Sequence, residues 1–235
     1  MELEYIGDEL SLFEKAKNWK SYWGNFVAPY LKGDVLEVGA GLGGTTMALS
    51  SYPSKSWTCL EPDPALTYQL EQKKIKGELP ASAEIITGTL QDLKPSAGFD
   101  CILYIDVIEH IEDDKTELVH ASHFLNPGGY LFVLVPAHQW LYSPFDKAIG
   151  HYRRYNKSML KAAGPKNLQL QYVKYLDSVG LLASTVNKLF LQQSMPTASQ
   201  IQLWDSSMVP VSRWTDKIVL HRIGKTVIGL WKKIE

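Results

Sequence analysis

The stretch Val35 to Thr46, VLEVGAGLGGTT, decides the fold class of this chain, because an apolar run leads directly into a loop that holds four glycines. Small residues let backbone amides approach a ligand closely, and a helix that begins after such a loop points its positive end at an anionic group. Gly39, Gly41 and Gly44 have the spacing G-x-G-x-x-G. The loop therefore predicts a nucleotide-type ligand, and its anionic group can be a pyrophosphate or a carboxylate.

Apolar runs alternate with amphipathic stretches over the first 136 residues. The runs lie at residues 34–39, 56–62, 83–88, 99–106 and 129–136, and helices are expected at residues 43–52, 64–75 and 114–125. Strands that alternate with helices are typical of βα units around a parallel sheet. Two further strands are predicted at residues 168–175 and 225–233, with a helical insertion between them.

The composition is that of an ordinary globular protein. Hydrophobic residues make up 45% and charged residues 21% of the chain, which excludes a disordered or membrane-spanning class. The 24 basic and 25 acidic residues are spread along the chain, so no nucleic-acid partner is predicted. The acidic N-terminus lacks the features of a signal peptide, which predicts a cytoplasmic protein without a transmembrane segment. Cys59 and Cys101 lie in apolar runs and are expected to be buried thiols.

Further motifs follow the glycine loop in a fixed order. They are CLEPDP at residues 59–64, ITGTLQDL at residues 86–93 and FDCILYIDVIEHIED at residues 99–113. In this order and spacing the chain resembles the class I S-adenosylmethionine-dependent methyltransferases, most specifically over residues 34–136. A nicotinamide dehydrogenase would share the glycine spacing and an acidic residue after the second strand, but it does not need the polar cluster after the fourth strand.

The resemblance implies an α/β fold with a seven-stranded, mostly parallel, Rossmann-like sheet whose strand 7 is antiparallel. The chain would be a single domain. Residues 1–32 would form an N-terminal helical cap and residues 33–136 the cofactor-binding half. Residues 137–235 would supply an acceptor-side loop, a helical insertion between strands 6 and 7, and the last strands.

The resemblance also implies S-adenosyl-L-methionine as cofactor. Gly39 and Gly41 would bound its methionine part, with Glu37 nearby, and Glu61 would accept the ribose hydroxyls. The other residues expected at the cofactor are Pro62, Asp63, Thr89, Leu90, Ile105 and Asp106. Family members often carry an acidic residue near position 89, so a threonine hydroxyl or a main-chain group would contact the adenine here.

Catalysis is expected to depend on aligning the acceptor with the methyl group in a dry pocket. A base is needed only where the acceptor carries a proton that must leave. The catalytic candidates are His110, His151 and Asp106, because imidazole titrates near neutral pH and Asp106 follows the fourth strand. The structural alternatives are that His110 hydrogen-bonds a loop and that Asp106 fixes a turn.

Asp106, Glu109 and His110 also resemble the Glu-x-x-Glu-His pattern of ubiquinone-biosynthesis O-methyltransferases, in which that cluster can hold a divalent metal. Carboxylate and imidazole ligands suit magnesium or zinc. The pattern Asp-x-x-Glu-His also occurs widely in this superfamily without a metal, so no metal is predicted.

The segment FDKAIGHYRRY at residues 145–155 resembles a bacterial branch of these enzymes in which this loop faces the acceptor. Paired arginines can hold a carboxylate or a phosphate. The residues expected to bind the acceptor are His138, Arg153, Arg154, Tyr155, Trp19 and Tyr22. The structural alternatives are that Asp146 pairs with one arginine and pins the loop, and that the aromatic rings fill the core.

The acceptor is expected to be a small molecule with an oxygen nucleophile. The alternatives are N- or C-methylation of a natural product or of a lipid-linked or glycan acceptor, and a nicotinamide-dependent oxidoreductase. Five apolar residues of the insertion are too few to span a bilayer, so core packing is expected for them and a lipid-facing surface is the alternative. They are Leu181, Leu182, Val186, Leu189 and Phe190. Peripheral membrane contact and oligomeric state stay open.

Overall fold

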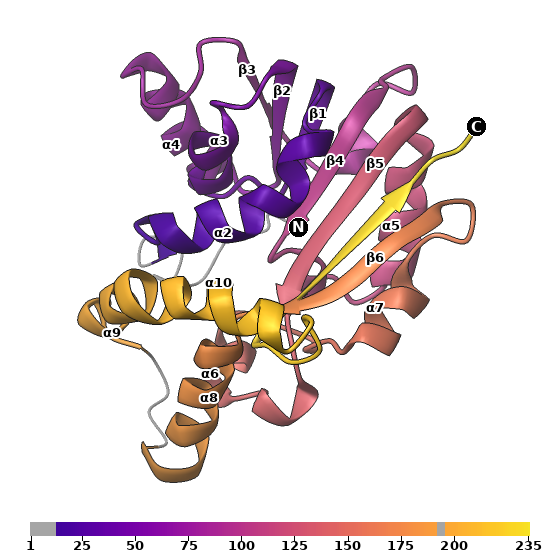
Figure 1. The fold of residues 1–235 in the computed structure, drawn as a ribbon. Coiled ribbons are helices and arrows are strands. Elements are labelled where there is room, and N and C mark those ends of the chain that lie inside the picture. The colour runs from indigo at the N-terminus through magenta and orange to yellow at the C-terminus, as the bar shows by residue number, and fades with distance from the viewer. Residues whose placement is uncertain (1–12, 192–195) are drawn as a thin grey trace.

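The computed structural model describes residues 13–191 and 196–235, and its centre is a seven-stranded sheet in the order β3-β2-β1-β4-β5-β7-β6 (Figure 1). Strands β1 to β5 pair in parallel, whereas β7 runs antiparallel between β5 and β6. The strands are β1 (Gly33–Val38), β2 (Ser54–Glu61), β3 (Ala83–Thr87), β4 (Phe99–Ile105), β5 (Leu125–Pro136), β6 (Gln169–Leu176) and β7 (Thr226–Lys232). The predicted Rossmann-like sheet with an antiparallel strand 7 is confirmed.

The sequence of each strand matches its place in the sheet. The central strands are continuous apolar runs because helices cover both of their faces. The edge strand β6 begins with exposed polar residues, Gln169 and Gln171 among them. The sequence Asn126-Pro127-Gly128-Gly129 has the composition of a turn, but these residues already belong to β5. The main chain of residues 128 and 129 pairs there with Lys233, just beyond β7.

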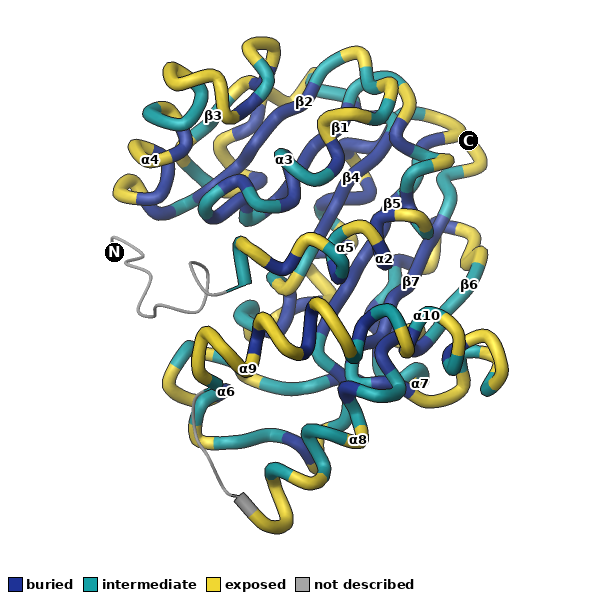
Figure 2. Tube along the Cα trace, turned by 60° about the vertical axis from the view of Figure 1, so that its left-hand side comes forward, coloured by how far each residue is buried: buried dark blue, intermediate teal, exposed yellow. Residues whose placement is uncertain are grey.

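Helices pack on the two faces of the sheet as two separate apolar cores. One face is covered by α2 (Lys17–Val27), α3 (Gly44–Leu49), α4 (Pro64–Ile75), α9 (Ala198–Leu203) and α10 (Val209–Ile218). The other face is covered by α5 (Asp114–His123) and α7 (Lys157–Ala163). Figure 2 shows the buried strands between more exposed helices. Asn156 caps α7, since its side chain accepts the Met159 N–H.

The expected helical insertion between β6 and β7 comprises α8 (Ser178–Val186), a π-helical segment (Asn187–Leu191), α9, a second π-helical segment (Trp204–Met208) and α10. Its carboxylates attach it to the N-terminal helix. Asp205 accepts the Trp19 N–H at 2.8 Å and so caps α2, and Asp216 accepts the Tyr22 hydroxyl at 2.8 Å. Residues 1–12 of the expected cap lie outside the described residues.

The expectation that the apolar residues of the insertion pack in the core is wrong for four of the five. Leu182, Val186, Leu189 and Phe190 are exposed, and Phe190 keeps 78% of its surface. The inward side of α8 is instead held by polar contacts that start at its N-cap, Asp177. In the described part of the chain, no helix is long and apolar enough to cross a membrane.

Candidate active site

The glycine loop between β1 and α3 has a backbone that only glycine adopts easily. Gly39, Gly41 and Gly43 have positive φ angles of 69°, 54° and 77°. A Cβ on Gly39 would lie 2.6 Å from a methyl carbon of Val107, so the loop packs closely against the segment after β4. The Gly39 N–H also donates to the carbonyl of Leu60 in β2 at 2.7 Å. The loop is thus held at the carboxyl ends of three neighbouring strands, where doubly wound sheets bind their ligands.

Glu61, the last residue of β2, is fixed directly beside this loop. Its Oε2 accepts the Gly41 N–H at 2.8 Å, and its Oε1 accepts the Asp63 N–H at 3.0 Å, with half-buried Pro62 between them in sequence. Burial raises the pKa of Glu61. Because a carboxylate oxygen can accept two hydrogen bonds, both oxygens retain acceptor capacity for ribose hydroxyls. The ribose role expected for Glu61 stays a prediction, and it requires this free acceptor capacity.

The side chain of Glu37 links β1 to α3 and to β2. Its Oε2 accepts the Thr46 hydroxyl at 2.5 Å and the Trp57 indole N–H at 3.0 Å. Burial raises the pKa of Glu37 to about 7. The carboxyl group therefore supports α3 and β2 from within the protein, next to the loop where the methionine part of the cofactor is expected.

The segments expected at the adenine lie next to Glu61. The Gly88 N–H donates to the Glu61 carbonyl at 2.9 Å, which places the turn after β3 beside the end of β2. Asp63 caps α4, and exposed Thr89 caps the short 3-10 helix Leu90–Asp92. The Leu90 side chain is buried in the core. Leu90 can therefore offer only main-chain groups to a cofactor.

Lys20 of α2 lies beside the glycine loop, although sequence reasoning did not name it as a candidate. Its Cε would lie 3.1 Å from a Cβ on Gly44, at the start of α3. Burial lowers the pKa of Lys20 to about 8, while Glu14 and more distant carboxylates, Asp106 included, oppose that shift. Lys20 Nζ donates to the main-chain carbonyls of Phe13 and Glu14 at 2.6 and 2.9 Å, so its ammonium group is held in place near the expected methionine carboxylate. No sequence signal marks it, because the expected cap helix carries several lysines.

The end of β4 lies between the glycine loop and β5. Ile105 is half-buried and packs against the core on the α2 side. Asp106 has a φ of 54°, and its N–H donates to the carbonyl of Leu134 in β5. The Asp106 side chain touches solvent although protein atoms surround it, and this desolvating environment raises its pKa to about 6. Asp106 is therefore an exposed residue at the carboxyl end of β4, directly before the segment that packs against the glycine loop.

A buried polar network on the loop after β5 centres on Asp146. Its Oδ1 lies 3.0 Å from Nδ1 of His151, and its two oxygens accept bidentate hydrogen bonds from Arg154 at 2.8 and 3.1 Å. Burial acts to raise the pKa of Asp146, but the hydrogen bonds from His151 and Arg154 lower it below its usual range. Asp146 is therefore an ionised carboxylate that fixes the His151 ring and occupies the Arg154 guanidinium.

His110 and Glu109 meet His151 from the other side. The His110 ring stands edge-on to the His151 ring with 4.5 Å between centroids. Burial, with a contribution from His151, lowers the pKa of His110 to about 4. Glu109 is fully buried, neither of its carboxylate oxygens has a hydrogen-bond partner, and Oε1 lies 3.9 Å from Nε2 of His151. Burial, with repulsion from Asp106, raises the pKa of Glu109 well above its usual value.

These three side chains have the donor set of a divalent metal site. Ligand atoms of Glu109, His110 and His151 all lie within 4.8 Å of one another. Two imidazole nitrogens and one carboxylate suit zinc or a similar cation with open positions. The unpartnered oxygens of Glu109 fit a cation as well. The sequence suggested Asp106, Glu109 and His110 as the possible ligand set, and no metal was predicted because that pattern is common without one. In the structure His151 joins Glu109 and His110 instead of Asp106, which the motif alone does not reveal.

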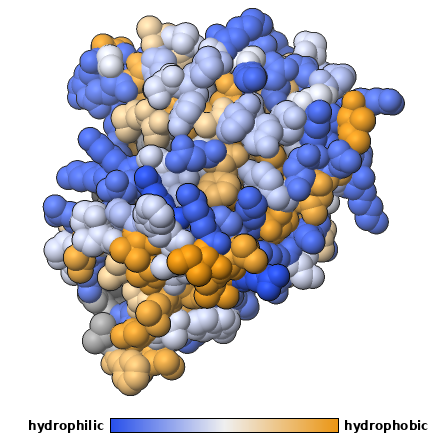
Figure 3. Space-filling view, in the orientation of Figure 1, coloured by the Kyte–Doolittle hydropathy of each residue, from blue (hydrophilic) through white to orange (hydrophobic). Residues whose placement is uncertain are grey.

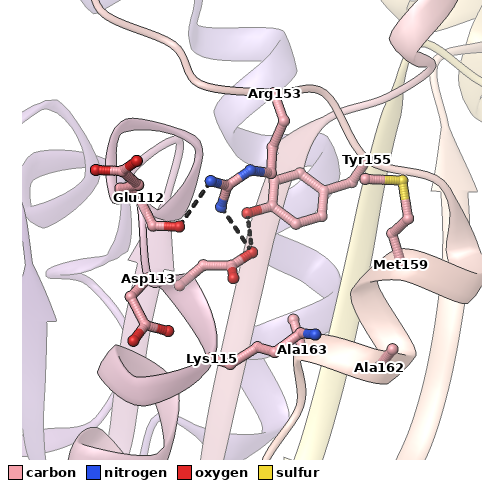
Figure 4. Close-up of a pocket in the computed structure, with 9 residues that line it drawn as sticks. Glu112, Asp113, Lys115, Arg153, Tyr155, Met159, Ala162 and Ala163 are labelled. Carbon is pink, nitrogen blue, oxygen red and sulfur yellow. Dashed lines mark hydrogen bonds and ion pairs between the residues drawn. The ribbon is translucent and has the colours of Figure 1, made fainter.

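Arg153 and Tyr155 face a different hollow from the one expected. They line a cavity of about 410 Å³ together with residues at the start of α5 and in α7 (Figure 4). Arg153 donates to the carbonyls of Ile111 and Glu112, and Tyr155 donates to the Asp114 carboxylate at 2.5 Å. These contacts pin the loop to α5. None of the residues expected at the cofactor lines this cavity.

The remaining residues expected to bind the acceptor have contacts within the protein. The His138 ring bonds the Gly224 carbonyl through Nε2 and stacks on Tyr175, and burial lowers its pKa. Trp19 and Tyr22 are buried between α2 and the insertion, where Trp19 packs against the Trp204 ring. The two rings therefore offer little free surface to an acceptor.

Comparisons with known proteins agree with this fold. Residues 36–131 match the family model described as a methyltransferase domain. No curated protein sequence matches the chain.

Solved structures with the same fold include an S-adenosylmethionine-dependent methyltransferase from Clostridium acetobutylicum, with 12% identity, 93% of this chain and 92% of that chain covered, and a TM-score of 0.59. Another is a Haemonchus contortus phosphoethanolamine N-methyltransferase 2 in complex with S-adenosylhomocysteine. It is 14% identical, the match covers 97% of this chain and 58% of that chain, and the TM-score is 0.64. A third is coclaurine N-methyltransferase bound to N-methylheliamine and S-adenosylhomocysteine. It is 13% identical, the match covers 93% of this chain and 72% of that chain, and the TM-score is 0.62. The family match over residues 36–131, the sheet order and the glycine loop together are those of the class I S-adenosylmethionine-dependent methyltransferase fold.

Proposed function

We propose that this enzyme transfers the methyl group of S-adenosylmethionine to an oxygen nucleophile of a small-molecule acceptor, with His151 as general base. The observation that carries the proposal is the buried Asp146–His151 pair, whose hydrogen bond of 3.0 Å lies on the acceptor-side loop. In this proposal residues 33–136 hold the cofactor and residues 137–235 supply the acceptor side.

The cofactor would be held by the groups at the carboxyl ends of β1, β2 and β4. Glu61, fixed by the Gly41 N–H, would accept the ribose hydroxyls, and Lys20 would attract the methionine carboxylate. The sulfonium supplies a methyl group that is open to in-line displacement. The protein's task is then to align the acceptor oxygen with the methyl group and to exclude water from the space between them.

His151 is suited to remove the acceptor proton because Asp146 fixes its tautomer. An ionised Asp146 accepts the Nδ1–H, which leaves the lone pair on Nε2. The 3.9 Å from Nε2 to Glu109 Oε1 is too long for a hydrogen bond, so Nε2 stays available. As the new O–CH₃ bond forms and the S–CH₃ bond breaks, the acceptor proton passes to Nε2. His110, with its lowered pKa, is a weaker base and would shape the site.

A metal-assisted version is the second candidate, and the unpartnered oxygens of Glu109 favour it. Glu109, His110 and His151 would then hold a divalent cation, which would supply Lewis-acid polarisation of the acceptor oxygen. His151 would act as a ligand rather than as a base. N-methylation is a further alternative, and N-methyltransferases occur among the proteins with this fold.

The experiment is a comparison of acceptors that differ only in the nucleophilic atom, such as matched phenols and anilines, with S-adenosylhomocysteine release as the readout. Turnover of the hydroxyl compounds alone supports the proposal, whereas turnover of the amines alone would show that the enzyme is an N-methyltransferase.

His151→Ala should lower kcat about a hundredfold with an unchanged Kd for S-adenosylhomocysteine. The matched control is His123→Ala, on an exposed position of α5. Loss of activity on chelation, with recovery on adding zinc or magnesium, would favour the metal-assisted version.

A further inference from the structure

Helix α10 turns polar residues toward the protein and apolar residues toward solvent. Ser212 and Asp216 are buried, and Asp216 accepts the main-chain N–H groups of Asp177 and Ser178 at 2.7 and 2.9 Å. These contacts fix the rotation of the helix. The opposite side carries Val211, Trp214 and Ile218, which are 51%, 75% and 78% exposed. An ordinary surface helix has the reverse arrangement.

The exposed apolar residues of α8 and the following π-helical segment extend this surface. Leu182, Val186, Leu189 and Phe190 are all exposed. Besides the hydrogen bond from the Ser178 N–H to Asp216, helix α8 is joined to α10 by contacts from the Val179 N–H to the Ser212 hydroxyl and between the hydroxyls of Ser178 and Thr215. Figure 3 shows apolar side chains gathered over α10 and over the far end of α8 on one side of the molecule. We call these seven residues, 182, 186, 189, 190, 211, 214 and 218, the docking face.

The exposed charges on the segment that carries the docking face have one sign. The only carboxylates between residues 178 and 223 are Asp205 and Asp216, and both are buried and hydrogen-bonded inside the protein. The exposed charged side chains of the same segment are Lys188, Lys217 and Arg222. Lys217 lies over the Trp214 ring, 5.9 Å from its centroid. The docking face is therefore apolar with a basic rim.

We propose that the docking face binds the surface of an anionic lipid bilayer as a peripheral contact. Tryptophan and aliphatic side chains gain by entering the boundary between headgroups and acyl chains, while lysine and arginine at its rim attract anionic headgroups. A second copy of this chain would bring an equally basic rim against this one, so like charges would oppose that occupant. The proposal concerns where the enzyme sits and does not depend on the acceptor or on the base.

The test is co-sedimentation of the full chain with vesicles of phosphatidylglycerol or of phosphatidylcholine. The protein should bind the anionic vesicles at least tenfold more strongly, and added salt should weaken that binding. The double variant Phe190→Ser and Ile218→Ser should reduce binding at least tenfold. The control makes the same change at two exposed apolar residues of α4, as Tyr68→Ser and Ile75→Ser, and should bind as the unmodified chain does.

A second measurement uses the unmodified fold. Lipids brominated on their acyl chains should quench the tryptophan fluorescence of the bound protein, and Trp214→Phe should remove most of the quenching. Failure to bind phosphatidylglycerol at low salt would overturn the proposal, as would equal loss of binding in the two serine double variants. Concentration-dependent dimerisation that the Phe190→Ser and Ile218→Ser variant abolishes, without vesicle binding, would assign the face to a second copy and also overturn it.

Discussion

Replacing Glu61 with glutamine tests the cofactor cradle with a change of very small size. The carboxylate accepts two backbone N–H groups, from Gly41 at 2.8 Å and from Asp63 at 3.0 Å, and it is 5% exposed. A glutamine amide has one oxygen and one NH₂ group, so it can accept only one of these two hydrogen bonds. The other N–H would face a donor inside the protein.

The structure separates two consequences of Glu61→Gln. A buried N–H without an acceptor costs about 1–3 kcal/mol, which for a chain of this size lowers Tm by roughly 2–10 °C. Loss of a charged acceptor for the ribose hydroxyls costs a further amount of about 1.5–3 kcal/mol in binding. The Kd for S-adenosylhomocysteine should therefore rise roughly ten- to a hundredfold.

Isothermal titration calorimetry with S-adenosylhomocysteine measures the second effect, and a thermal melt of the free enzyme measures the first. Glu71→Gln makes the same chemical change on the exposed side of α4 and should alter neither quantity. An unchanged Kd for the Glu61→Gln variant, in a protein that still melts cooperatively, would refute the assignment of Glu61 to the ribose.

Three other changes test features around the cradle. Gly39→Ala should weaken S-adenosylhomocysteine binding and lower Tm more than Gly77→Ala does. Both glycines have a positive φ, but only at Gly39 would a Cβ lie 2.6 Å from Val107. Equal effects of the two variants in calorimetry and thermal melts would count against the tight loop. Asp146→Asn should lower kcat at least tenfold and leave the cofactor Kd unchanged, since it removes the charge that fixes the base; an effect on Kd alone would argue for a purely structural role. Burial raises the pKa of Glu37 from 4.5 to about 7, so the folded chain binds that proton more tightly than the unfolded chain and stability falls as pH rises through this window. Glu37→Gln should remove that part of the decline, and Tm curves of the two proteins that stay parallel between pH 5 and pH 8 would contradict it.

The first half of the fold could be predicted because its signals are local. The helix expected at residues 64–75 is α4, Pro64–Ile75, since Asp63 and Pro64 mark its start directly in the sequence. The glycine loop and the acidic residue after β2 likewise follow their strands at short spacing. Strand order and the antiparallel β7 came from the family resemblance, because pairing between distant strands leaves no local signal.

The acceptor side could be predicted only as a group of polar residues. Its partners depend on how the loop of residues 137–155 folds back onto the end of β4. That path brings His151 beside Glu109 and pairs Arg154 with Asp146. Arg153 instead donates to a main-chain carbonyl just before α5. The side chains alone do not distinguish the two adjacent arginines.

The insertion shows the same limit for apolar residues. A hydrophobic composition predicts burial, but burial requires a partner surface. In the insertion, buried Asp177 and Asp216 take the inward positions through hydrogen bonds to neighbouring main-chain groups, and Trp214 and Phe190 remain outside. Buried carboxylates with several donors each are a tertiary feature that the pattern of hydrophobic residues does not report.

A crystal structure of the enzyme with S-adenosylhomocysteine tests the central claim most directly. The account predicts ribose hydroxyls within hydrogen-bond distance of the Glu61 carboxylate. It also predicts a sulfur atom that faces the space between Asp106 and Nε2 of His151. A ribose bound away from Glu61, or a sulfur atom that faces away from His151, would contradict it.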